Sequence, residues 1–333
     1  MRVLFIGGTG NISTACGRLA LAANMDLYIL SRGNRASPEL KDATFIKADI
    51  SKLPQAKKAL HGMVFDVVVN FIAFTPEEVE RDIQLFSGKC GQYIFISSAS
   101  AYQKPLSHHL ITESTPLANP YWDYSRDKIA CEELLMKAYR EKGFPVTIVR
   151  PSHTYETVIP VAIGSWEDFT IIDRMRKGGT VIIHGDGTSL WTITHSQDFA
   201  KGFVGLMGNM QAIGHSFHIT SEELLNWNQV YQAVAEAAGV ELKAVHIATD
   251  FICLEADKIG QEWMRGNLLG DKANSVVFDN TKIKRFVPGY VATIPFKEGI
   301  KRTVDWFDAH PDRIRIDAEN NRLMDAILAA YPG

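Results

Sequence analysis

Cysteine is scarce in this sequence, and the few cysteines lie far apart. The 333 residues contain no Cys-x-x-Cys pair and only four cysteines, which are Cys16, Cys90, Cys131 and Cys253. This spacing argues against a disulfide framework and against a cysteine-ligated metal, so we expect buried, reduced thiols. The adjacent His108 and His109 have no further ligands at a suitable spacing, and we predict no metal site.

Long apolar runs are also missing. The most apolar stretch, residues 63–74, is too short to span a bilayer, and it carries Asp66 and Asn70. No small-residue cleavage site follows an apolar run near Met1, as a secretory signal would require. We therefore expect no membrane association and a cytoplasmic location.

Neither sign of charge dominates the chain. Lys and Arg number 35 against 38 Asp and Glu, which gives a formal net charge of -3. This balance argues against a broad electrostatic surface for nucleic acid, so we expect a small-molecule partner and no nucleic acid. Apolar residues make up 46% of the chain, enough to offset chain entropy, which excludes disorder as the main state.

The first half of the sequence alternates short β-branched runs with helical patterns. Strands are predicted at 2–6, 26–30, 44–48, 64–70, 92–97 and 145–149, and helices at 12–23, 75–88 and 121–141. Such alternation implies right-handed βαβ units. We therefore predict the α/β class, with a doubly wound parallel sheet, or Rossmann fold.

The pattern becomes less regular after Arg150-Pro151. Helices are expected at 165–178, 196–208, 226–238 and 311–330, and extended segments at 181–183 and 215–219. We assign residues 1–155 to a dinucleotide-binding domain, to which 186–220 return. Residues 156–185 and 221–333 then form a smaller, mixed α/β substrate lobe.

A glycine-rich segment, Gly7-Gly8-Thr9-Gly10, follows the first strand and opens a helix. Glycines allow backbone to approach a pyrophosphate, and the helix N-terminus supplies free N–H groups and a positive dipole end. A plain tight turn is the alternative. The position after an N-terminal strand in a βαβ pattern favours dinucleotide binding.

The second strand ends without an acidic residue. Arg32 and Arg35 stand where an acid would hold an adenosine ribose 2′-OH, and they suit a 2′-phosphate instead. We therefore predict that NADP is preferred and that NAD is a second choice, unless both arginines are simply solvated. Asp49, after the third strand, is either an adenine ligand or a turn residue.

Three further residues form a catalytic pattern. Tyr124 and Lys128 are spaced i, i+4 on one helix, and Ser98 follows a strand whose end meets the same sheet edge. A nearby ammonium and the nicotinamide charge are expected to lower the phenol pKa from about 10 toward neutrality. The phenol would then exchange a proton with a substrate oxygen.

These motifs together resemble the extended short-chain dehydrogenase/reductase family, in its NAD-dependent epimerase/dehydratase branch. GGTGNIS resembles the TGxxGxxG loop, SSASAY the serine segment and YSRDK the YxxxK motif of that family. RPSHTY at 150–155 and HGDGTSLWTITHSQD at 184–198 resemble its RPxxxYG strand end and its hinge. The resemblance covers essentially the whole chain. The sequence also resembles a divergent subgroup that includes chloroplast stem-loop RNA-binding proteins.

The resemblance implies roles for individual residues. Tyr124 would be the acid/base, Lys128 its pKa tuner and ribose ligand, and Ser98 the anchor of the substrate oxygen. The cofactor would contact Gly7, Thr9, Gly10, Asn11, Ile12, Arg32, Arg35, Asp49, Ile50, Phe71, Ile72, Ala73, Tyr124, Lys128, Pro151 and His153. The substrate would contact Ser100, Tyr155 and Trp191.

The sequence departs from the family pattern at several positions. Ser13 replaces the third loop glycine, and Trp191 stands where nucleotide-sugar enzymes carry an arginine for the substrate diphosphate. Ala99 and Ser100 occupy the places of the acidic pair of 4,6-dehydratases, so we predict no 4,6-dehydration. Substitute diphosphate ligands, or else solvated surface charges, are Arg174, Arg176, Lys177 and Arg265.

The resulting functional prediction is an NAD(P)-dependent oxidoreductase or epimerase. It would act by hydride transfer on a hydroxyl or ketone of a sugar or a sugar-nucleotide-like substrate. The alternative is a non-catalytic protein of the same fold that senses a dinucleotide or binds RNA. The resemblance further implies a homodimer in which the helices near 75–88 and 121–141 pair with those of a second subunit.

Overall fold

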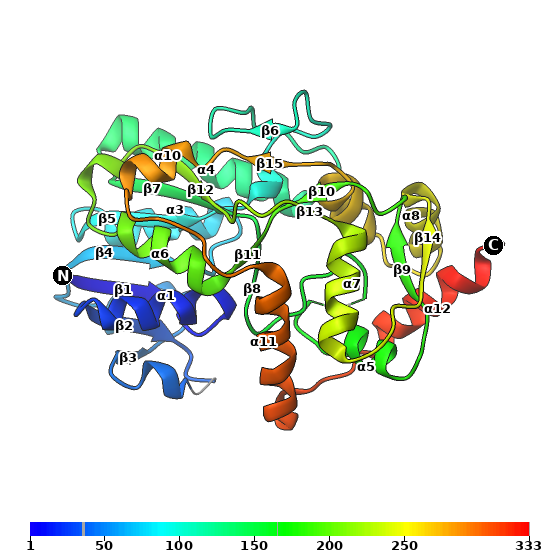
Figure 1. The fold of residues 1–333 in the computed structure, drawn as a ribbon. Helices are drawn as coiled ribbons and strands as arrows, with labels where there is room; N and C mark the ends of the chain where they lie inside the picture. Colours follow the sequence, from blue (N-terminus) through cyan, green and yellow to red (C-terminus); the bar gives the residue numbers. More distant parts are fainter. Residues whose placement is uncertain (35–36, 165, 333) are drawn as a thin grey trace.

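A computed structural model shows a large parallel sheet, covered by helices, at one end of the molecule and a smaller lobe at the other end (Figure 1). It describes residues 1–34, 37–164 and 166–332. Arg35, one of the predicted cofactor ligands, lies outside the described residues. No helix in the described ranges is both long and apolar enough to cross a membrane.

The large sheet contains seven strands, each preceded or followed by helices. The strands are β1 (Arg2–Ile6), β2 (Asp26–Ser31), β3 (Thr44–Lys47), β4 (Phe65–Asn70), β5 (Cys90–Ile96), β7 (Val146–Pro151) and β12 (Ser216–Ile219). The helices that pack on it are α1 (Asn11–Ala22), α2 (Leu53–Ala59), α3 (Pro76–Phe86), α4 (Asp123–Lys142), α6 (Ser196–Leu206) and α10 (Thr281–Phe286).

The order of the strands confirms the predicted doubly wound fold. All seven are parallel, in the order β12-β7-β5-β4-β1-β2-β3. The chain moves outward from β1 to β3 and then crosses back to β4, so the direction of winding reverses between β1 and β4. A crevice at the carboxyl ends of the strands is expected at this reversal.

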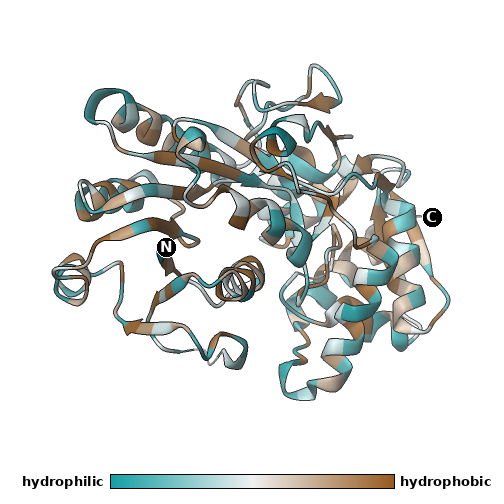
Figure 2. Cartoon of the chain, turned by 60° about the vertical axis from the view of Figure 1, so that its left-hand side comes forward, coloured by the Kyte–Doolittle hydropathy of each residue, from teal (hydrophilic) through white to brown (hydrophobic). Residues whose placement is uncertain are grey.

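Both faces of the sheet are buried, as alternate residues of β1 illustrate. Val3 and Phe5 pack with α1 and α6 on one face, while Leu4 and Ile6 pack with α2, α3 and α4 on the other. The central strands are accordingly rich in hydrophobic residues, which appear brown in Figure 2, whereas the edge strand β3 is mostly exposed. Burial of both faces is typical of parallel sheets.

The smaller lobe combines short strand pairs with helices. Its helices are α5 (Thr170–Arg176), α7 (Trp227–Ala238), α8 (Thr249–Lys258), α9 (Trp263–Asn267), α11 (Phe296–Ala309) and α12 (Ala318–Ala330), and a π-helix spans Leu268–Lys272. The short strands are β6 (Leu110–Ile111), β8 (His153–Tyr155), β9 (Val181–His184), β10 (Leu190–Trp191), β11 (Ile193–His195), β13 (Leu225–Asn226), β14 (Ala244–Ile247) and β15 (Val277–Phe278).

Two helices of this lobe are shorter than the sequence predicted. The helix expected at 165–178 begins only at Thr170, whose amide donates to Asp168 Oδ1 at 2.9 Å, one residue ahead of the N-cap residue Phe169. The helix expected at 311–330 begins only at Ala318, because Asp317 caps it through the Glu319 amide. Side-chain caps of this kind satisfy the first free N–H groups of a helix and set where it starts.

A buried ion pair joins α4 to the sheet. Glu132 on α4 accepts two hydrogen bonds from Arg150 on β7, at 2.9 and 2.6 Å, and a third from Ser97 Oγ at 2.5 Å. Both charged side chains are about 95% buried. The bidentate geometry holds α4 in one register against β5 and β7.

We predict that Glu132→Ala lowers the free energy of unfolding by about 3–5 kcal/mol, because it leaves the buried guanidinium of Arg150 without its partner. Glu133→Ala is the matched control, since Glu133 is exposed on the same helix, and we expect a change within about 0.5 kcal/mol. Urea denaturation of both variants measures the difference. Equal stability of the two variants would contradict this account of the ion pair.

Candidate active site

The glycine loop between β1 and α1 leaves no room for a side chain at its start. Gly7 has φ +78, and a Cβ there would lie 2.5 Å from Ile72 Cγ2. A Cβ on Gly8 would lie 3.0 Å from Ile29 Cγ2 on β2. The backbone therefore passes close over the sheet edge, as a loop that cradles a pyrophosphate must.

Ser13, which replaces the third glycine of the loop pattern, stabilises the loop through hydrogen bonds of its hydroxyl group. Its hydroxyl accepts a hydrogen bond from the Gly10 amide at 2.8 Å and donates to the Gly7 carbonyl at 3.1 Å. These bonds hold the loop closed at the start of α1. The N-terminus of α1 borders a cavity of about 290 Å³ together with Gly7 and Gly10, which is where a helix dipole favours an anion.

Cationic side chains gather where β2 and β3 end. Arg32 directly follows β2, and the Lys47 side chain packs against Gly33, 3.5 Å from where a Cβ would stand. Asp49 accepts hydrogen bonds from the Ser51 amide and hydroxyl, which lower its pKa, and the charges of Lys52 and Arg32 act in the same direction. Asp49 therefore serves as a turn residue in this structure.

Lys128 is buried, with 2% of its surface exposed. Its ammonium donates to the carbonyls of Ala73 at 2.7 Å and Ile96 at 2.8 Å, and it lies 4.4 Å from the centre of the Phe74 ring. Burial lowers the pKa of Lys128 to about 8. The residue thus links α4 to the carboxyl ends of β4 and β5.

Tyr124 lies one turn earlier on α4, with its ring centre 5.8 Å from the Lys128 ammonium. The expected lowering of its pKa is not found: burial raises the pKa of Tyr124 to about 12, although hydrogen bonding with Ser98 acts in the opposite direction. The Lys128 ammonium is committed to backbone carbonyls. The phenol is consequently a proton donor at neutral pH.

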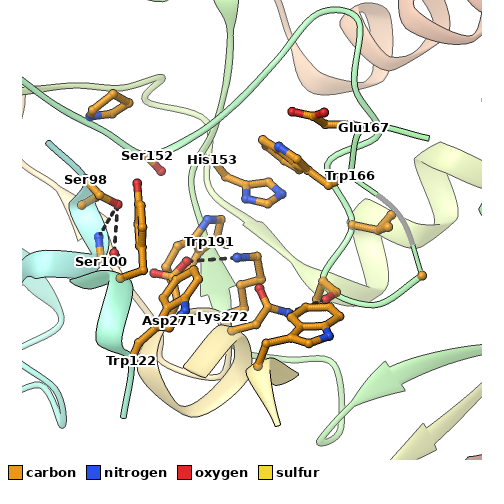
Figure 3. A pocket seen from close by; sticks show the side chains of 18 of the residues that line it. Ser98, Ser100, Trp122, Ser152, His153, Trp166, Glu167, Trp191, Asp271 and Lys272 are labelled. Atoms are coloured by element: carbon orange, nitrogen blue, oxygen red, sulfur yellow. Dashed lines mark hydrogen bonds and ion pairs between the residues drawn. The ribbon is translucent and has the colours of Figure 1, made fainter. Parts of the chain in front are cut away.

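Ser98 belongs to a chain of hydroxyl groups beside Tyr124. Its Oγ lies 2.9 Å from Ser100 Oγ and accepts from the Ser100 amide at 3.2 Å, which caps a short 3₁₀ turn (Figure 3). Ser125 Oγ donates to Ser100 Oγ at 2.7 Å. These bonds fix the Ser98 hydroxyl next to the phenol of Tyr124, with which it forms a hydrogen bond.

A second cavity, of about 550 Å³, adjoins the first. Indole rings form much of its wall, and His153, Asp271 and Lys272 also line it (Figure 3). The residues common to both cavities are Ser98, Tyr124, Pro151, Ser152 and Trp166. The phenol therefore stands at the boundary between the two.

The structure brings most of the predicted site residues to these cavities. The first cavity is lined by Gly7, Gly10, Asn11, Ile12, Phe71, Ile72, Tyr124, Lys128 and Pro151, and the second by Ser98, Ser100, Tyr124, Pro151, His153 and Trp191. Ala73 contributes its carbonyl to Lys128. The predicted residues that line neither cavity are Thr9, Arg32, Asp49, Ile50, Ala73 and Tyr155.

Tyr155 is not a substrate contact in this structure. Its side chain is fully buried among Phe296 and His195, and its hydroxyl points to the Phe296 carbonyl at 3.4 Å. The helix α11, which begins at Phe296, closes over it. We therefore remove Tyr155 from the candidate site.

Sequence reasoning missed several residues of the second cavity. Trp166, Trp263, Asn267, Asp271 and Lys272 line it, yet they lie in loops, a five-residue helix and a π-helix. The tryptophans were the available signal, since an exposed indole in a loop is uncommon. Across the described residues, no three His, Cys, Asp or Glu side chains are grouped as metal ligands would be.

Comparison with known proteins agrees with this geometry. The model of the NAD-dependent epimerase/dehydratase family matches residues 3–220. A 2'-dehydrokanamycin reductase of Streptomyces kanamyceticus is 22% identical over 290 residues, which are 87% of this chain and 80% of the reductase.

Solved structures show the same fold at low identity. An epimerase of Methanothermobacter thermautotrophicus has a TM-score of 0.76, with 16% identity over 93% of either chain. A dTDP-glucose 4,6-dehydratase of Bacillus anthracis, solved in complex with NAD, has a TM-score of 0.73 and 16% identity over 94% of this chain and 98% of its own. From the family match, the glycine loop and the Ser98, Tyr124 and Lys128 arrangement, we conclude that this chain belongs to the NAD-dependent epimerase/dehydratase family.

Proposed function

We propose that this chain is an NAD(P)-dependent reductase of a ring ketone in a sugar-like substrate, with Tyr124 as the proton donor. The observation that carries the proposal is the shared wall of the two cavities, which contains Ser98 and Tyr124. A dinucleotide in the glycine-loop cavity and a substrate in the aromatic cavity would meet at these hydroxyl groups. A reaction at that boundary requires that the dinucleotide and the substrate are bound at the same time.

The residues suit a dinucleotide on grounds of shape and charge. The crowded Gly7 backbone gives the phosphates close access, and the N-terminus of α1 favours their charge. When bound, the nicotinamide supplies the hydride that the substrate carbon receives. The protein's part is then to hold the carbonyl oxygen and to deliver a proton to it.

Three side chains divide this work. Ser98 donates a hydrogen bond to the carbonyl oxygen and orients it. Tyr124 transfers its phenolic proton to the same oxygen as negative charge develops there, which is general acid catalysis. The positive charge of Lys128, 5.8 Å from the ring centre, stabilises the phenolate that remains. The phenol starts out protonated at neutral pH, as proton transfer in this direction requires.

The preferred cofactor in this proposal is NADP. Arg32 and Lys47 stand at the ends of β2 and β3, and Asp49 accepts from Ser51 through Oδ1. A 2′-phosphate would find two cations there, which supports NADP over NAD. Reduction also fits a relative whose name denotes a reductase, that of Streptomyces kanamyceticus.

Epimerisation is the second candidate, because solved structures that share the fold include an epimerase. The two candidates differ in how they hold the cofactor. An epimerase regenerates its own cofactor and retains it, so denaturing the purified protein would release NAD detectable by mass. A reductase exchanges its cofactor at every turnover, so we expect an empty site that titrates with NADPH. The lack of 4,6-dehydration, argued from Ala99 and Ser100, stays a prediction.

Tyr124→Phe should lower kcat by about 10²–10⁴-fold, because it removes the proton donor, and NADPH affinity should stay within twofold of the unmodified chain. Tyr121→Phe is the matched control, since Tyr121 is an exposed tyrosine just before α4, and it should leave turnover unchanged. Ketone-dependent NADPH consumption and NADPH titration measure the two effects. Undiminished turnover in Tyr124→Phe would show that Tyr124 is not the proton donor, and unchanged biological activity in this variant despite lost turnover would favour the sensor or RNA-binding alternative.

Arg32→Ala should weaken NADPH binding about tenfold and leave NADH binding unchanged, because only NADPH carries the 2′-phosphate that a guanidinium binds. Arg285→Ala, an exposed arginine on α10, should change neither. Calorimetric titration of both cofactors gives the two dissociation constants. An equal loss for NADPH and NADH would show that Arg32 does not read the 2′ position.

We further propose a homodimer formed through α3 and α4, which lie side by side on one face of the sheet (Figure 1). Pairing of these helices with those of a second copy would form a four-helix bundle. Light scattering should then give twice the chain mass of 37.1 kDa. A particle of the single-chain mass at micromolar concentration would rule the dimer out.

A further inference from the structure

The second cavity is walled by indole rings from four separate segments. Trp122 precedes α4, Trp166 follows β8 in a loop, Trp191 lies on β10, and Trp263 opens α9. Figure 3 shows Trp122, Trp166 and Trp191 around the space that His153 and Asp271 also face. Aromatic faces provide large, rigid apolar area, onto which the C–H face of a saturated ring packs.

The charge of this wall does not suit a phosphate. Its charged side chains are three carboxylates and one ammonium, which belong to Glu167, Asp168, Asp271 and Lys272. The Lys272 ammonium lies 3.1 Å from Asp271 Oδ2 and is already paired (Figure 3). A second ammonium nearby, that of Lys104, is buried outside the lining and also interacts with Asp271.

The arginines proposed as substitute diphosphate ligands are engaged elsewhere. Arg174 pairs with Asp325, Arg176 with Asp308, and Arg265 with Asp257. Lys177 likewise pairs with Asp173. Among the described residues that line the cavity, none is an arginine. A diphosphate would therefore meet excess negative charge without the charge-assisted donors that it requires.

Three polar atoms in the wall have no hydrogen-bond partner within the described part of the chain. They are Trp191 Nε1, His153 Nε2 and Asp271 Oδ1, and each side chain is more than nine-tenths buried. Leaving such a group unpaired costs about 1–3 kcal/mol. All three side chains line the same cavity, while the three atoms each expose less than 1 Å², so a ligand would pair with them after a small movement of the wall.

The donor and acceptor character of this set can be assigned. The indole N–H donates only and the carboxylate accepts only. Burial holds the pKa of His153 well below its usual value, and a backbone hydrogen bond with Pro160 opposes that shift only in part. The ring is thus neutral. With one nitrogen donating to the Pro160 carbonyl, Nε2 is an acceptor. One donor and two acceptors match hydroxyl groups, which act as both.

A π-helix holds part of this wall in place. Residues Leu268–Lys272 form it, and the Lys272 carbonyl accepts from Trp227 Nε1 at 3.0 Å. Asn119 Nδ2 bridges the carbonyls of Ser100 and Gly270, at 2.8 and 2.7 Å. The π-helix is therefore tied to the serine turn beside Tyr124. Single π turns of this kind are frequent at functional sites.

We propose that the substrate is a ring ketone of a phosphate-free polyol, a glycoside or cyclitol type of molecule, and not of a nucleoside diphosphate sugar. The indoles pack on its ring faces, and its hydroxyls pair with Trp191, His153 and Asp271. This proposal rests on the proposed function, because the ring carbon next to Tyr124 is the one that exchanges hydride.

The test is calorimetric titration of the full chain saturated with NADPH. The neutral probes are methyl glucopyranoside, glucosamine and myo-inositol, and the anionic probes are UDP and UDP-glucose. We expect at least one neutral probe to bind and both anionic probes to bind at least tenfold more weakly. Preferential binding of UDP or UDP-glucose, or failure of every neutral probe, would overturn the proposal.

Two variants test whether side chains of the cavity wall bind the polyol. Trp191→Phe keeps the aromatic face but removes the N–H, and Asp271→Asn replaces the carboxylate by an amide. Measured in the direction of polyol oxidation with NADP, each should raise the KM of the accepted polyol about three- to tenfold with kcat changed less than twofold, since Trp191→Phe removes a donor and Asp271→Asn weakens a charged acceptor. Trp306→Phe, which removes an indole stacked on His310 away from the cavity, should alter neither constant.

The outcomes separate this proposal from the function on which it rests. Hydride transfer that works only with UDP-sugars would overturn the substrate class and leave the reductase intact. Loss of NADPH binding together with absence of any hydride transfer would overturn the function itself. A KM for the polyol that Trp191→Phe and Asp271→Asn leave unchanged would show that these atoms do not contact it.

Discussion

The buried ammonium of Lys128 has to find its hydrogen bonds inside the protein. It finds two, at the carbonyls of Ala73 and Ile96, which lie where β4 and β5 end. Any shift of α4 would leave a buried cation with fewer acceptors, and this costs several kcal/mol. The sheet edge and the helix that carries Tyr124 are therefore held in one arrangement.

The same face of α4 meets the sheet at three successive turns. Tyr124, Lys128 and Glu132 follow one another at four-residue intervals, so they line up along the helix. Glu132 binds Arg150 and Ser97, Lys128 binds the two carbonyls, and Tyr124 reaches the cavity boundary beside Ser98. The phenol of Tyr124 is thus the last of three contacts, and the two behind it are the ones that make its position rigid.

The sheet half of the molecule was predictable because its signals are local. A strand followed by a glycine loop and a helix is visible within about twenty residues, and the loop at Gly7 behaves as predicted in its backbone and packing. The i, i+4 pair of Tyr124 and Lys128 is equally local. Its electrostatics were not predictable, because the burial of Tyr124 and the two carbonyls that bind Lys128 are properties of the folded chain.

The lobe was harder to predict because its contacts are long-range. The sequence of α11 does show a helical hydrophobic pattern, with buried apolar residues at Phe296, Ile300, Val304 and Phe307. Because the sequence analysis did not predict this helix, it assigned a substrate contact to Tyr155, which α11 covers. Trp166 and Trp263 carry no periodic signal. They belong to the site only because the loop after β8 and the start of α9 approach each other in the fold.

The separation between the sheet edge and the smaller lobe has a consequence for substrate specificity. In the proposed reaction, hydride and proton are handled at the sheet edge, by groups held through Lys128 and Glu132. The far side of the second cavity comes instead from β10, α9 and the π-helix. Under this proposal, substitutions in those segments would change which ring is accepted and leave the buried contacts of α4 untouched. Membership of the family therefore specifies the chemistry far more tightly than the substrate, and the substrate has to be inferred from the wall itself.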